Sequence, residues 1–190
     1  MVEILAVVAA LSIVAAAAVP KLVEAAGGMT LGQGLGEVRQ ELEMARLRAA
    51  AADRPVRVRF NCPSAGHYRT VEVIGRPGSP DEADSPLSRC SDVAYPYPAA
   101  DRDPTTRPND DGPLRRLDAS LSFGAVPALE FWPDGSVHQQ AGVGDAWPEV
   151  DAAGTAITVK KGSMVKTITV NRLGKIQDVR GRSLGRKISP

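Results

Sequence analysis

Residues 2–20 read VEILAVVAALSIVAAAAVP, an apolar run with one acid near its start and a proline at its end. Residues 4–19 are apolar apart from Ser12, and Leu22 and Val23 continue the run. About 20 apolar residues are long enough to cross a bilayer as a helix. The sequence therefore predicts a membrane-spanning helix close to the N-terminus.

A cleaved secretory signal is the alternative to a retained helix. Residues 15–18 are all alanine and would supply a cleavage site, but a secretory signal carries positive charge ahead of its apolar stretch. The chain instead begins Met1-Val2-Glu3. A carboxylate in a membrane helix is a candidate functional group, although a helix N-terminus also favours negative charge. Pro20 is expected to interrupt the helix, because proline lacks a backbone donor.

The composition allows one ordinary domain with an appendage. The chain has 190 residues, of which 43% are hydrophobic and 24% charged, enough apolar content to exclude a fully disordered protein. Two cysteines exclude a disulfide-dense scaffold. The net charge of +1 is unevenly distributed, because residues 155–190 hold nine basic residues and one acid. A basic end on an otherwise acidic chain indicates an anionic partner.

A second helical pattern follows the apolar run. Glycines between residues 27 and 36 are expected to bend or locally melt the helix, since glycine costs about 1 kcal/mol against alanine. An apolar stripe with helical spacing then recovers, and Asp53-Arg54-Pro55 should stop it. Packing on a sheet is the simplest use of the stripe, and a partner subunit is the alternative. The stripe comprises Leu35, Val38, Leu42, Ala45, Ala49 and Ala52.

Short strands should make up most of the remaining ordered chain. Residues 56–60 alternate with period two, and residues 68–74 should pair with them as a hairpin. Turn residues separate the later segments. These later strands are expected at 120–123, 128–132, 136–138, 156–160, 165–170 and 175–179.

These features together resemble one branch of a known family. Val2-Glu3-Ile4-Leu5, the apolar run and Ala18-Val19-Pro20 resemble the N-terminus of type IV pilins and type II secretion pseudopilins. Ala45-Arg46, Ala49 and Arg54-Pro55-Val56 resemble a passage of the GspH/FimT branch, which contains minor pseudopilins and minor pilins. Residues 131–135 and 168–174 resemble its closing β-ribbons. The resemblance covers residues 1–60 well and 129–179 moderately.

The resemblance implies an α+β fold, a type IV pilin-like long N-terminal helix packed on a small antiparallel β-sheet domain. It implies that Glu3 neutralises the N-terminal amine of a neighbouring subunit inside a filament, because charges in a low-dielectric bundle are tolerable as a pair. Pro20 would be the proline late in the membrane helix. Met1 falls at the third mature position, so a leader cut by a prepilin peptidase, with N-methylation after cleavage, is expected to precede it.

The expected organisation has three parts. Residues 1–26 form a transmembrane and filament-core helix, 27–54 an amphipathic helix, and 55–190 a globular β-domain. The expected location is the inner membrane, single-pass, with the globular domain in the periplasm and a place near the filament tip after assembly. Expected partners are other pilin or pseudopilin subunits, inner-membrane lipid and the prepilin peptidase. The sequence leaves both a type II secretion pseudopilus and a type IV pilus open as the host machine.

Residues 76–118 hold eight prolines and eight aspartates without periodicity, which predicts a long loop. Cys62 and Cys90 bracket its first part. A disulfide between them would pin the loop in an oxidising compartment, and two unrelated thiols are the alternative. Oxygen ligands for Ca²⁺ would come from Asp101, Asp103, Asn109, Asp110 and Asp111. Their spacing matches no calcium loop, so a solvated acidic loop is favoured and no metal site is expected.

No enzyme motif is present in the sequence. His67 and His138 lack metal-ligand spacing and are expected at the surface. Phosphate-binding, nucleophile-elbow and dinucleotide motifs are absent. The chain is therefore expected to be a structural or binding protein without a cofactor.

The basic C-terminal region, with its tail at 180–190, is the candidate binding site. Lysine and arginine neutralise phosphates without reading sequence, and the Gly-Arg steps resemble the tail implicated in DNA capture by FimT-type minor pilins. Double-stranded DNA captured during natural transformation is therefore the alternative partner. A solvated tail, or one touching neighbouring subunits, is the other interpretation. The candidate residues are Lys160, Lys161, Lys166, Arg172, Lys175, Arg180, Arg182, Arg186 and Lys187.

Overall fold

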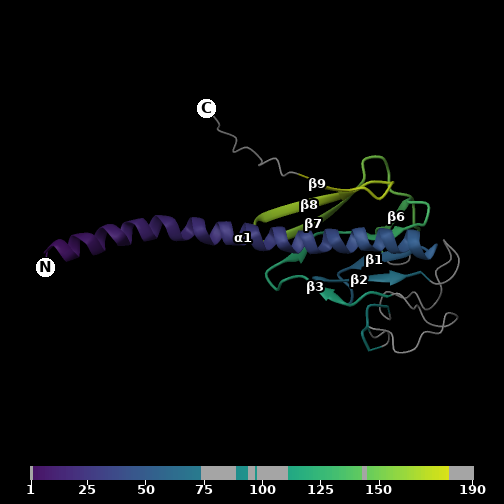
Figure 1. Ribbon diagram of the computed structural model, residues 1–190, viewed down its shortest axis with the longest axis horizontal. Coiled ribbons are helices and arrows are strands. Elements are labelled where there is room, and N and C mark those ends of the chain that lie inside the picture. The colour runs from purple at the N-terminus through teal and green to yellow at the C-terminus, as the bar shows by residue number, and fades with distance from the viewer. Residues whose placement is uncertain (1, 74–88, 94–96, 98–110, 143–144, 180–190) are drawn as a thin grey trace.

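One long helix spans the computed structural model, and antiparallel strands pack around its C-terminal half (Figure 1). The N-terminal half projects from these strands as a gently curved rod. The structure describes residues 2–73, 89–93, 97, 111–142 and 145–179. For residues 2–11, 13, 14, 17 and 20 it describes the backbone alone.

The helix α1 runs without a break from Val2 to Ala52, over 51 residues. The expected interruption at Pro20 is therefore wrong, and so is the expected melting at the glycines. A proline removes one backbone donor and crowds the preceding turn. That cost is local, so the helix continues on either side. The segments expected at 1–26 and 27–54 form one continuous helix.

The glycines in the middle of α1 allow other elements to approach the helix closely. A methyl group at Gly34 would collide with Leu121 Cδ1, and one at Gly27 would collide with Met164 Cε. The packing at these two positions offsets the low helix propensity of glycine, which is about 1 kcal/mol per residue. Nothing lies within 4 Å of a methyl group at Gly28 or Gly36.

The helix ends where the sequence predicts. Asp53 adopts a left-handed backbone conformation with φ of 52°, and the amide of Arg54 donates to the carbonyl of Ala49 over 3.3 Å. Pro55 then leads the chain into the first strand, since the residue before a proline avoids the helical region.

The strands form two antiparallel sheets among the described residues. One sheet has the order β3-β2-β1-β5-β6 and the other β4-β7-β8-β9. The expected hairpin is present, because β1 pairs with β2 from Val56↔Glu72 to Phe60↔Tyr68. The strands are β1 (Val56–Phe60), β2 (His67–Glu72), β3 (Arg115–Arg116), β4 (Ser122–Phe123), β5 (Ala128–Phe131), β6 (Val137–Gln140), β7 (Thr155–Lys161), β8 (Met164–Val170) and β9 (Ile176–Val179).

Strand β3 was not expected, since residues 76–118 were predicted to be a loop throughout. It is a two-residue edge strand that pairs with His67 and Tyr68 of β2. A strand of two residues is too short to show the alternation that predicts a strand from sequence. The position of β3 depends instead on its pairing with β2.

Both sheets pack on the C-terminal half of α1. The helix contacts β1 and β5 of one sheet and β7, β8 and β9 of the other. Five stripe residues, from Leu35 to Ala49, are buried, which confirms packing on a sheet, whereas Ala52 is exposed because the helix ends there. Phe60 and Tyr68 meet Phe123 edge to face, with ring centroids 5.2 and 5.7 Å apart, and join the two sheets. The α+β fold predicted from the sequence is confirmed.

Candidate assembly and binding surfaces

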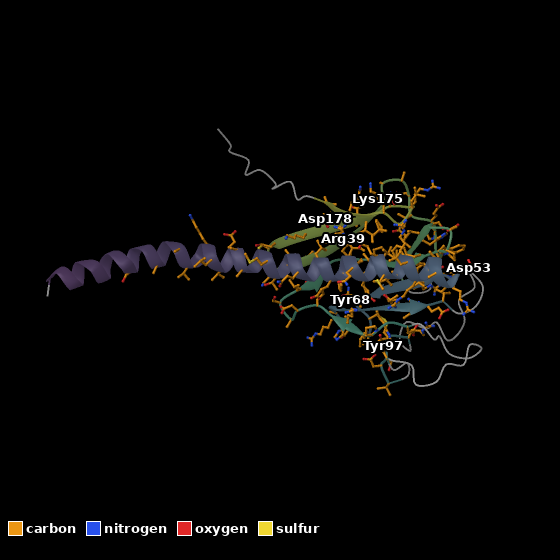
Figure 2. The ribbon with its side chains drawn as sticks, viewed as in Figure 1. Arg39, Asp53, Tyr68, Tyr97, Lys175 and Asp178 are labelled. Atoms are coloured by element: carbon orange, nitrogen blue, oxygen red, sulfur yellow. A yellow bond between two sulfur atoms is a disulfide. The ribbon has the colours of Figure 1, made fainter. Side chains whose placement is uncertain are left out.

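The projecting half of α1 carries exposed apolar side chains. Val19, Leu22, Val23 and Met29 are 55%, 68%, 67% and 70% exposed. Apolar side chains that gather on one exposed element mark a contact with another protein or with a membrane. Figure 2 shows this part of the helix standing clear of the side chains around both sheets. The side chains of Glu3 and Pro20, the two candidate assembly residues, lie outside the described residues.

The sequence also predicted that the first 26 residues cross a membrane. Among the residues that the structure describes, no helix is long and apolar enough to do so.

The described basic candidates fall into two groups at opposite ends of β8. Lys160 and Lys161 end β7, and Lys166 lies near the start of β8. Arg172 and Lys175 lie in the turn between β8 and β9, about 20 Å away along a strand of this length. Arg172 also forms an ion pair with Glu149 at 3.3 Å. The five residues therefore do not form one continuous surface.

The C-terminal candidates Arg180, Arg182, Arg186 and Lys187 lie outside the described residues. The strand before them is described, because β9 ends at Val179, which pairs with Thr167 of β8. The described chain thus ends close to Lys166, at the same end as the first lysine group.

Cys62 and Cys90 form a disulfide, with their Cα atoms 5.5 Å apart. Cys62 lies two residues after the end of β1, and Cys90 lies in a short turn outside the sheet. The bond joins residues 28 positions apart and fixes the 89–93 segment beside the first sheet.

Two buried arginines fix the same segment. Arg89 Nη2 and Nε donate to the Asp111 carboxylate at 2.6 and 3.1 Å, and Nη2 also donates to the Glu72 carbonyl. Arg69 donates to the carbonyls of Gly112 and Arg89 at 2.8 and 3.0 Å. Burial raises the pKa of Asp111, and Arg89 offsets this only in part. Asp111 therefore acts as a partner for Arg89.

A second buried charge pair lies between β1 and β5. Arg57 and Glu130 are each 1% exposed, face each other across the two strands and form an ion pair. Trp132 Nε1 donates to the other Glu130 oxygen at 2.7 Å, and the Arg57 guanidinium lies 4.2 Å from the Trp147 ring centre. Burial and the neighbouring Arg57 lower the pKa of Arg59 to about 10, so it stays charged at neutral pH.

Sequence reasoning missed these charged residues as core residues. Arg57 and Arg59 alternate with valines in VRVRF, a pattern that is typical of a strand with one solvated face. An acid on a neighbouring strand, Glu130 between Leu129 and Phe131, is the signal that would have indicated a buried pair.

The two histidines, which were expected at the surface, are half-buried and take part in local contacts. His67 Nδ1 lies 2.9 Å from the Ser64 hydroxyl. His138 stacks on Trp132 at 4.5 Å, and its Nδ1 lies 3.0 Å from the Trp147 carbonyl oxygen. Within the described ranges no three His, Cys, Asp or Glu side chains gather as metal ligands. Of the calcium candidates, residues 101–110 lie outside the described part.

No protein-family profile and no curated protein matches the chain. Two crystal structures of the type IV minor pilin FimU from Pseudomonas aeruginosa strain PAO1 are similar to it. The crystal in space group P21 gives a TM-score of 0.46 at 12% identity, over 78% of this chain and 87% of that one. The crystal in space group P65 gives 0.43 at 11% identity, over 77% and 90%.

Proposed function

We propose that the chain is a minor pilin or pseudopilin, a filament subunit of a type IV pilus or a type II secretion pseudopilus. In this proposal residues 1–26 hold it in the inner membrane and later pack in the filament core with other subunits. Residues 55–190 form the periplasmic domain, and a prepilin peptidase processes the full-length precursor. The two sheets leave half of α1 uncovered, and this observation carries the proposal.

The exposed apolar residues on that half support assembly through the helix. Burying a leucine or valine side chain contributes about 1.5–3 kcal/mol. Val19, Leu22 and Val23 gain this stabilisation when lipid or neighbouring helices cover them. The Cys62–Cys90 disulfide fits an oxidising compartment such as the periplasm.

The test compares two leucine-to-aspartate variants with matched exposure. Leu22 on the projecting helix is 68% exposed and Leu173 in the β8–β9 turn is 64% exposed. Leu22→Asp should abolish recovery of the chain with sheared filaments and other subunits from its host cell, and Leu173→Asp should leave it unchanged. Glu3→Ala should impair incorporation as well. Normal incorporation of both Leu22→Asp and Glu3→Ala would overturn the proposal.

DNA capture by the basic tail is a second candidate function. The observation that favours it is the position of Val179, the last described residue, at the end of the sheet that carries Lys160, Lys161 and Lys166. The full chain in detergent would be titrated with duplex DNA at several salt concentrations. The Arg180→Ala/Arg182→Ala/Arg186→Ala variant should bind more weakly, and its salt slope should fall by about 0.9 for each lost phosphate contact. Equal binding by both proteins would exclude the tail as the DNA site.

A further inference from the structure

The β7–β8 hairpin reaches the point where α1 leaves the globular part. Met164 Cε lies against Gly27, and Lys161 Cε lies 4.0 Å from where a methyl group at Gly27 would be. Lys166 Nζ lies 3.0 Å from the same position at Gly32. Figure 1 shows β7 and β8 ending over the helix at this point, beside the start of the projecting rod.

Four lysines lie on the elements that meet here, and we name them the basic rim: Lys21 on α1, Lys160 and Lys161 at the end of β7, and Lys166 near the start of β8. Lys161 and Lys166 lie against the helix, whereas Lys160 points away from it. Lys21, Lys160 and Lys166 are exposed, and Lys161 is half-exposed. Lys21 lies on the rod itself, six residues before Gly27.

The acids near the basic rim are fewer than the lysines. Asp118 lies close enough to Lys161 to interact with it, and hydrogen bonds from Ser120 lower the pKa of Asp118. Glu24 lies on the rod beyond Lys21 and is exposed. Asp178 on β9, opposite Ile168, is paired with Arg39 at 3.2 Å. Among the described residues the rim therefore has an excess of positive charge.

The distance from the rim to the apolar run suits a membrane surface. Leu22 and Val23 end the run, and Gly27 lies four residues after Val23, about 6 Å along the helix at 1.5 Å per residue. The polar headgroup layer is roughly 5–8 Å thick on one side of a bilayer. Gly27 therefore lies about where this layer ends.

We propose that the basic rim binds anionic lipid headgroups and seats the globular domain against the membrane while the subunit is stored there. This inference rests on the proposed function, since it places the apolar run in the bilayer. A gap of about 6 Å is too small for a DNA duplex, which is wider than its own major groove of about 12 Å. The rim therefore fits lipid phosphates better than nucleic acid as long as the helix is inserted.

The experiment reports how close the hairpin tip lies to the headgroups. Ser163 is exposed in the β7–β8 turn, and a fluorophore on Ser163→Cys would transfer energy to headgroup-labelled lipid. The full chain is reconstituted into phosphatidylcholine vesicles with and without phosphatidylglycerol. Transfer should be stronger with phosphatidylglycerol, and 1 M salt should remove the difference because it shortens the screening length to about 3 Å.

Two double variants with the same charge change separate the rim from net charge. Lys160→Gln/Lys166→Gln removes two rim charges, and Arg172→Gln/Lys175→Gln removes two at the far end of β8. The rim variant should shift the balance away from the seated state by about 25-fold, taking roughly fivefold for each lysine. The far-end variant should behave as the unsubstituted chain does.

Equal transfer in the two lipids, or equal loss in both variants, would overturn the inference. It would also fail if duplex DNA bound through Lys160 and Lys166 displaced the hairpin from anionic vesicles. Alkaline extraction distinguishes a failure of the proposed function. A chain that leaves the vesicles does not hold an inserted helix, and both proposals then fail. If the chain is retained but energy transfer is the same with and without phosphatidylglycerol, only the lipid inference fails.

Discussion

Charged residues on the outer face are buried in the first sheet and exposed in the second. In the first sheet Arg57, Arg59 and Arg69 point away from α1 and are at most 5% exposed. In the second sheet Lys160 points outward and stays exposed. Segments distant in the sequence cause the difference, because residues 89–93, 111–112 and Trp147 cover the first sheet. Local alternation predicts a strand, but only a covering segment decides whether its polar face is solvated.

Removing one partner of the buried pair should have the largest effect. Arg57→Ala leaves Glu130 charged in the core, and breaking a buried ion pair typically costs 3–5 kcal/mol. Chemical denaturation of the detergent-solubilised chain would measure the loss. The control Arg57→Met/Glu130→Leu replaces both charges with apolar groups, and its free energy of unfolding should be close to that of the unsubstituted protein. A loss below about 1 kcal/mol in Arg57→Ala would show that the outer face is not sealed.

Removing the disulfide should loosen residues 89–93, which cover the outer face of the first sheet. Cys62→Ala/Cys90→Ala removes a crosslink between residues 28 positions apart, and the chain entropy that the unfolded state regains should lower the free energy of unfolding by about 3.5 kcal/mol. Denaturation with and without a reductant would measure it, with the reduced unsubstituted chain as the control. Unchanged stability in both would mean that Arg69 and Arg89 hold residues 89–93 without the disulfide.

The pH dependence of stability tests whether Tyr68, on the inner face of the first sheet, is buried. Burial raises its pKa to about 12 from 10.0, and nearby Glu37 adds to the effect. The unfolded chain therefore loses this proton first, so the contribution of Tyr68 is fully present below pH 10 and disappears between pH 10 and 12. The slope is about 1.4 kcal/mol per pH unit. Tyr68→Phe should remove this part of the alkaline loss, and an identical profile for both proteins would contradict a buried phenol.

The smallest effect is expected on the open face of the second sheet. Lys160→Gln removes a solvated charge and should change the free energy of unfolding by less than about 0.5 kcal/mol. Chemical denaturation of Lys160→Gln and Arg57→Ala under the same conditions compares the two losses of stability. A loss of several kcal/mol in Lys160→Gln would show that the outer face of the second sheet is covered as well.

Local patterns predicted most of the fold. The helical spacing of the stripe from Leu35 to Ala49 and the two-residue alternation at 56–60 predicted these elements, because both patterns depend only on residues close together in the sequence. The uninterrupted helix did not follow, because Gly27 and Gly34 reflect contacts with Met164 and Leu121, far along the chain.

The candidate sites were predicted less completely. The residue types of the basic region were identified, but most of the length of β8 separates Lys166 from Arg172 and Lys175. Asp111 was grouped with neighbouring acids by proximity in sequence, whereas it pairs with Arg89. Ion pairs of this kind depend on which loops fold over a sheet. Short-range periodicity carries no information about that.

The unbroken helix also has a mechanical consequence. At 1.5 Å per residue, α1 is a rod of about 77 Å whose last two dozen residues are clamped between two sheets. A tilt of roughly 10° at the free end swings the clamped end through about 13 Å. A push along its axis reaches the globular part without a joint that would absorb it. A force applied to the free end of α1 is therefore transmitted to the whole globular part.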